Sequence, residues 1–94
     1  MFAIAFDLVV EETLEAHPRG LRQAYSDVEA TLSGFGFARV QGSVYLTENE
    51  DLTKLVGAMN ALKALHWFPA SVRDIRAFRV EQWSDFTGFM KETN

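Results

Sequence analysis

The most regular hydrophobic pattern of the chain lies in residues 1–10, where large and small side chains alternate. One side of an extended strand would carry Phe2, Ile4, Phe6, Leu8 and Val10, and the other Ala3, Ala5, Asp7 and Val9. A strand that is apolar on both sides is typical of the centre of a sheet. We therefore predict a central strand here, with Asp7 as a charge that must be hydrated, paired or used.

The next stretch predicts a loop and then a helix. Residues 11–18 are acidic and end in Pro18, so we expect a loop. Between Gly20 and Phe35 the apolar residues recur at helical spacing, namely Leu21, Tyr25, Val28, Leu32 and Phe35. Gly34 and Gly36 are typical of a helix C-terminus.

A hairpin and a second helix follow. Residues 37–41 and 44–47 alternate around Gly42-Ser43, which predicts two strands joined by a type II′ turn. Residues 47–50 have the S/T-x-x-E spacing of a capping box, so we expect them to begin the next helix. Its apolar stripe would be Leu52, Leu55, Val56, Met59 and Leu62.

The C-terminal part predicts one more strand and a short helix. Residues 66–69 interrupt the second helix, and residues 75–81 alternate as a last strand. Ser84 would cap a terminal helix that buries Phe86, Phe89 and Met90. The order βαββαβ predicts an α+β, ferredoxin-like sandwich with a four-stranded antiparallel sheet and a short C-terminal helix.

This topology brings distant residues together. Right-handed crossovers give the strand order 4-1-3-2, so Asp7 would lie near the Gly42-Ser43 turn and near Arg73-Asp74. We expect Asp7, Ser43 and Tyr45 to share the face that the helices leave open. Alternation places Asp74 on the covered face, unless it precedes the regular strand or lies at a bulge. The covered face would carry Phe2, Ile4, Phe6, Val40, Val44, Leu46, Phe78 and Val80.

Composition narrows the class of protein. The 94 residues suffice for one domain, 1–94, and the absence of cysteine excludes disulfides and thiolate chemistry and agrees with a cytoplasmic protein. The N-terminus is neither a signal peptide nor a membrane span. A net charge of −4 argues against a protein that coats nucleic acid, but not against a local basic patch. The uncovered, partly apolar face predicts a homodimer, formed through that face or through edge strands.

Three interpretations of Asp7 are open. It would cap the hairpin or pair with an arginine, it would bind Mg²⁺ together with other oxygen ligands, or it would act as a general base. An ordinary aspartate has a pKa of about 3.9 and is a poor base at neutral pH, so the third role needs a second carboxylate nearby. Arg73 and Arg76 would form surface ion pairs or contact phosphates. His17 and His66 have no partner at metal-ligand spacing, and we expect both to be structural.

Three segments resemble one known family. The opening AIAFDL, the central GF-x-x-x-QGSVY over residues 36–45 and SVRDIRAFRVEQWSDFT over residues 71–87 look like virulence-associated protein D, VapD. The resemblance covers nearly the whole chain, although residues 9–20 depart most from it. The family is similar in fold to the small CRISPR-associated proteins of spacer acquisition, which also carry an aspartate at the end of the first strand.

The resemblance implies a homodimeric endoribonuclease that acts as the toxin of a toxin–antitoxin pair, with a small antitoxin protein as partner. The family's active-site residues match Asp7, Ser43 and Asp74. Asp7 would bind a divalent ion or orient the attacking oxygen, with Asp74 in support, and Ser43 would hydrogen-bond a phosphate or water. Arg73 and Arg76 would stabilise charge on the phosphorane. The alternative hypothesis is a non-catalytic dimeric module that binds a protein or nucleic-acid partner.

Overall fold

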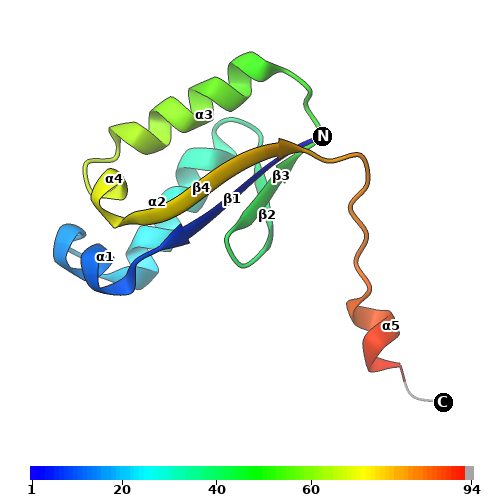
Figure 1. Cartoon of the computed structure of the whole chain (residues 1–94), viewed down its shortest axis with the longest axis horizontal. Helices are drawn as coiled ribbons and strands as arrows, with labels where there is room; N and C mark the ends of the chain where they lie inside the picture. Colours follow the sequence, from blue (N-terminus) through cyan, green and yellow to red (C-terminus); the bar gives the residue numbers. More distant parts are fainter. Residues whose placement is uncertain (93–94) are drawn as a thin grey trace.

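The computed structural model describes residues 1–92, which is all but the last two residues of the predicted domain. Its elements, drawn in Figure 1, are β1 (Phe2–Leu8), α1 (Val10–Ala16), α2 (Leu21–Ser33), β2 (Ala38–Gln41), β3 (Val44–Thr47), α3 (Leu52–Ala64), α4 (Phe68–Ser71), β4 (Val72–Arg79) and α5 (Thr87–Lys91). The strands form one antiparallel sheet in the order β2-β3-β1-β4. The predicted ferredoxin-like α+β fold is confirmed, and so is the central position of the first strand.

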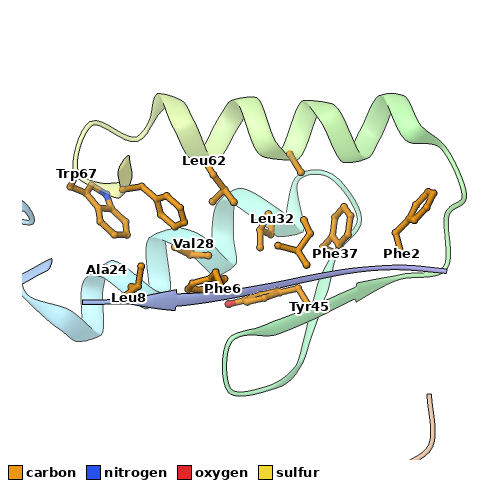
Figure 2. Packing of buried hydrophobic residues seen from close by; sticks show 13 residues of the cluster. Phe2, Phe6, Leu8, Ala24, Val28, Leu32, Phe37, Tyr45, Leu62 and Trp67 are labelled. Carbon is orange, nitrogen blue, oxygen red and sulfur yellow. The ribbon is translucent and has the colours of Figure 1, made fainter. Parts of the chain in front are cut away.

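The core lies between one face of this sheet and helices α2 and α3 (Figure 2). β1 contributes Phe2, Ile4, Phe6 and Leu8 to this core. The buried face of α2 consists of Ala24, Val28 and Leu32, which recur every four residues. Asp7 follows the part of β1 that is paired on both sides, and its own position is fixed by pairing with Asp74 of β4.

The predicted distribution of side chains between the two sheet faces was wrong for β3 and β4. Ile4 lies opposite both Tyr45 and Ala77, so Tyr45 is on the helix side. The face without helices, called the open face below, carries Ala3, Ala5, Asp7, Val44, Leu46, Asp74, Arg76 and Phe78. Both faces of β3 are apolar, so alternation alone could not decide which one packs on the helices.

The predicted loop over residues 11–18 is also wrong, because most of it forms α1. Glu11 and Glu12 lie in the first turn, where carboxylates interact favourably with the helix dipole. Thr13 is buried and donates a hydrogen bond to the carbonyl of Val9 at 2.7 Å. Val10, predicted to extend the apolar face of β1, begins α1 instead and is half exposed.

Helix α3 begins later than the predicted capping box. Its N-cap is Asp51, whose carboxylate accepts a hydrogen bond from the backbone N–H of Thr53 at 2.9 Å, while Thr47 is still part of β3. Its buried residues are Ala58 and Leu62, whereas Leu52 and Val56 of the predicted stripe are exposed. The helix ends before His66-Trp67-Phe68-Pro69, as predicted, and a short helix α4 leads into β4.

The terminal helix is present but does not bury the side chains expected of it. Phe86, Phe89 and Met90 are 61%, 67% and 75% exposed. α5 stands apart from the sheet and helices at the end of an extended segment (Figure 1). The Cα radius of gyration is accordingly 14.7 Å, whereas a compact chain of this length would have about 12 Å. No helix within residues 1–92 is long and apolar enough to cross a membrane.

Candidate active site

Two carboxylates from distant parts of the sequence lie opposite each other on the open face. Asp7 on β1 is the direct cross-strand partner of Asp74 on β4. The register shifts between Asp7 and Leu8, and Leu8 then pairs with Val72. The side chains of Asp7 and Asp74 are 65% and 48% exposed, so a ligand in solution can reach both. The sequence left open whether Asp74 shares the face of Asp7, and the register of β4 places both on the open face together with Phe78.

Arginines flank this carboxylate pair. The Nε of Arg76 lies 3.0 Å and 3.2 Å from the two carboxylate oxygens of Asp74. A guanidinium nitrogen of Arg73 lies 3.9 Å from Asp7, too far for a hydrogen bond. Asp74 is thus held by its ion pair, whereas Asp7 makes only a long contact and is the freer carboxylate.

Ser43 lies near this end of β1 but on the other side of the sheet. Its carbonyl accepts a hydrogen bond from the backbone N–H of Phe6 at 3.2 Å, so Ser43 lies beside the residue that precedes Asp7 on β1. Ser43 also lines a cavity of about 450 Å³ between the hairpin and α2, together with Tyr25 and Tyr45. The structure therefore brings Asp7 and Asp74 together and leaves Ser43 at the border between them and this cavity.

The hairpin that carries Ser43 is built as predicted. Gly42 has a positive φ of 44° and Ser43 does not, which is the pattern of a type II′ turn. The side chain of Arg39 braces this turn, since its Nε donates to the carbonyl of Gly42 at 2.7 Å.

Sequence reasoning missed the cavity. Arg22, Tyr25, Ser26 and Glu29 of α2 line it, and their spacing of three and four residues puts them on one face of the helix. Tyr25 belongs to the apolar residues that recur at helical spacing in residues 20–35, yet it is 36% exposed. The signal in the sequence was an aromatic residue flanked at helical spacing by Arg22 and Glu29.

The electrostatic character of the carboxylate cluster is balanced rather than acidic. Asp7, Asp74, Arg73 and Arg76 provide two negative and two positive side chains on one exposed surface. Such a set can orient a nucleophilic oxygen through a carboxylate and neutralise a phosphate through a guanidinium. Within residues 1–92 no group of three His, Cys, Asp or Glu side chains is placed to hold a metal ion.

Fold and site together define a small α+β protein with paired carboxylates and arginines on an exposed sheet face. No protein-family model matches the chain. It is 62% identical to a protein of Neisseria gonorrhoeae named Endoribonuclease VapD homolog, over 97% of this chain and 99% of that protein. It is 60% identical to the Endoribonuclease VapD of Haemophilus influenzae and 42% identical to that of Helicobacter pylori, again over 97% of this chain and 99% of each relative. The chain belongs to the VapD endoribonuclease family.

Proposed function

We propose that this protein is an endoribonuclease that cleaves phosphodiester bonds of RNA at the Asp7–Asp74 pair. The observation that carries the proposal is the cross-strand position of these two carboxylates between Arg73 and Arg76. The relatives named as VapD endoribonucleases support the reaction class. RNA is the substrate, and its phosphates supply the negative charge that the two arginines are suited to bind.

The geometry suggests a division of roles. Asp7 is the carboxylate without a close partner, so it orients the attacking oxygen and accepts its proton. Asp74 fixes Arg76 through the 3.0 Å contact, and Arg76 together with Arg73 stabilises the negative charge on the phosphate oxygens in the transition state. Ser43 lies at the edge of the site and hydrogen-bonds a phosphate or water from there.

Magnesium is a candidate cofactor of the same site. Mg²⁺ is commonly held by one or two protein carboxylates, with waters and substrate phosphates as its remaining ligands. Asp7 and Asp74 fit this pattern, because they are adjacent, exposed and oxygen-bearing. When bound there, the ion would supply Lewis-acid stabilisation of the phosphate charge.

The proposal includes a homodimer and a role as the toxin of a toxin–antitoxin pair in the cytoplasm. Support for the dimer comes from the exposed aromatic residues Phe78, on the open face, and Trp83, beside Leu46 of the same face, which are 45% and 40% exposed. Support for the toxin role comes from the resemblance of the three sequence segments to VapD. A small reading frame next to the gene, encoding a protein that binds this one, would add to that support.

The test is cleavage of a defined single-stranded RNA by wild type, Asp7→Asn, Asp74→Asn and Glu48→Gln. We expect Asp7→Asn to lower kcat by about 10²-fold or more, as loss of a general base does. Asp74→Asn should lower it less, since Arg76 remains. Glu48 follows β3 at the opposite end of β1, so Glu48→Gln should leave the rate unchanged.

Each outcome of this assay has a defined meaning. Equal cleavage by wild type and a folded Asp7→Asn variant would exclude the proposed site. Loss of cleavage in EDTA, restored by Mg²⁺ but not in Asp7→Asn, would support the metal role, and full activity in EDTA would exclude it. Absence of hydrolysis under all metal conditions, with retained RNA or protein binding, would favour the non-catalytic module.

A further inference from the structure

The cavity between the hairpin and α2 has the size and lining of a ligand site. Its volume of about 450 Å³ lies within the range of about 300–1,000 Å³ that is usual for small-molecule pockets. Two aromatic residues, Tyr25 and Tyr45, line it, and the ring of Phe6 packs against both. Phe6 stacks with Tyr25 at 6.3 Å between ring centroids and with Tyr45 at 6.1 Å, and Figure 2 shows Tyr45 beside Phe6. Tyr25 is the ring of this stack that is exposed to solvent.

Tyr45 provides an unused polar group in this cavity. The residue is 1% exposed, and none of the side-chain hydrogen bonds found within residues 1–92 involves its hydroxyl. Every fully enclosed polar side-chain atom in those residues does have a partner, so the hydroxyl opens into the cavity that Tyr45 lines. Burial raises the pKa of Tyr45, which keeps the hydroxyl protonated at neutral pH and able to donate.

The charged lining is suited to a nucleotide. Arg22 and Arg39 line the cavity, and neither belongs to an ion pair in the described part of the chain. Guanidinium groups bind phosphate bidentately, and an exposed tyrosine ring provides a surface on which a base stacks. Glu29, also on the lining, offers an acceptor for the N–H groups of a base edge.

The cavity is next to the carboxylate pair. Pairing of β1 with β3 ends at Ala5 and Val44, so β3 does not cover the edge of β1 at Asp7. Phe6, the central ring of the aromatic stack, directly precedes Asp7, and Ser43 borders both places. A single RNA strand bound around this uncovered edge would reach the carboxylates on one side of the sheet and the cavity on the other.

We propose that this cavity binds one nucleotide of the RNA, adjacent to the bond that is cleaved, with the base on Tyr25 and the phosphate on Arg22 and Arg39. The Tyr45 hydroxyl donates to the bound nucleotide. The inference rests on the proposed endoribonuclease activity, and it assigns the part of the substrate that this surface takes.

Binding is tested first without cleavage. Amide shifts of ¹⁵N-labelled wild-type protein are recorded during titration with adenosine 5′-monophosphate or uridine 5′-monophosphate, and with adenosine or inorganic phosphate alone. We expect shifts confined to residues 22–29 and 39–45, larger for a nucleotide than for either part alone. No shifts there, or equal shifts with phosphate alone, would overturn the nucleotide site.

Steady-state cleavage of a short RNA then measures the effect on catalysis. Tyr25→Leu should raise KM by about tenfold while Tyr25→Phe keeps the wild-type value, because base stacking needs the ring and not the hydroxyl. Arg22→Gln should raise KM and reduce its salt dependence, whereas Lys63→Gln on α3 should change neither. Tyr45→Phe should raise KM about three- to tenfold without lowering the thermal midpoint, since its hydroxyl makes no hydrogen bond within residues 1–92.

The two proposals fail in different ways. A wild-type protein that cleaves no RNA but shows the nucleotide shifts would overturn the activity and leave the binding site standing. A protein that cleaves RNA with an unchanged KM in Tyr25→Leu and Arg22→Gln would overturn the binding site alone.

Discussion

His17 is a buried residue whose contacts assign it a structural role at the junction of α1 and α2. Its Nδ1 accepts a hydrogen bond from the backbone N–H of Arg19 at 3.0 Å, so the ring hydrogen is on Nε2. Nε2 donates this hydrogen to the carboxylate of Asp27 at 2.7 Å, and the ring packs edge-on against Trp67. Gln23 donates to the other oxygen of the same carboxylate at 2.9 Å. The expectation that His17 is structural is therefore confirmed.

This network makes part of the stability dependent on pH. The hydrogen bonds from His17, and then from Gln23, hold the pKa of Asp27 below the ordinary value of an aspartate. A lowered pKa means that the stabilisation is complete above the ordinary value and is lost as the pH falls below it through the lower pKa of the folded state. We predict that Asp27→Asn lowers the free energy of unfolding by about 1 kcal/mol at pH 7, and by less as the pH falls from 4 to 2.5.

The measurement is urea denaturation of both proteins over this pH range. Glu15→Gln serves as the control, because Glu15 is exposed on α1 and has no ion pair within residues 1–92. A difference between wild type and Asp27→Asn that stays constant down to pH 2.5 would contradict the role given to the carboxylate.

At the scale of elements, the sequence predicted the order of strands and long helices because their periodicities are unambiguous. The prediction failed for α1. This short acidic segment has a single buried residue, Thr13, and therefore shows no apolar stripe from which a helix could be recognised. The prediction also failed at Thr47, because the local spacing of a capping box says nothing about how far the preceding strand extends. Tertiary pairing of β3 with β1 decides that boundary.

The candidate site shows the same limit. Topology alone predicted that Asp7, Ser43 and Asp74 would approach one another, because the end of a central strand meets the beginnings of both neighbours. Which of them share a face depends on the register, and the pairs Ile4 with Tyr45 and Asp7 with Asp74 could not be read from alternation. The cavity could not be predicted because it depends on how α2 lies over the hairpin.

The start of α3 gives a prediction at this scale. Asp51 accepts from the backbone N–H of Thr53, and the side chain of Asn49 accepts from the N–H of Asp51 at 2.8 Å. We predict that Asp51→Ala lowers the free energy of unfolding by about 1 kcal/mol, as loss of an N-cap does. Glu48→Ala should change it by less than about 0.5 kcal/mol, because Glu48 is exposed and lies before the cap. Urea denaturation at pH 7 measures the free energy of unfolding of both variants. A larger loss in Glu48→Ala than in Asp51→Ala would favour the capping box over residues 47–50 as the start of the helix.

For the whole molecule, one strand separates two different surfaces. Residues of β1 that point toward the helices build the core and support the cavity, whereas Asp7 on the same strand belongs to the open face. Helices α2 and α3 cover the face that builds the core. On the open face, Trp83 of the C-terminal segment lies beside Leu46 and Val40. A second copy of the chain on the open face would remove Phe78 from water and bring two carboxylate pairs to one interface.

Phe78 is the residue on which this interface can be tested. It is 45% exposed on the open face, opposite Ala3, so Phe78→Glu would place a charge where the two copies are proposed to meet. We predict that this variant sediments as a monomer at concentrations where wild type is a dimer, with a dissociation constant raised by at least about tenfold. Val56→Glu is the matched control, because Val56 is 56% exposed on α3, away from the open face. The control should keep the wild-type dimer.

If Phe78→Glu also kept the wild-type affinity at sedimentation equilibrium, the open face would not be the interface. The dimer would then have to form through a sheet edge, where the long strand β4 offers unpaired backbone groups.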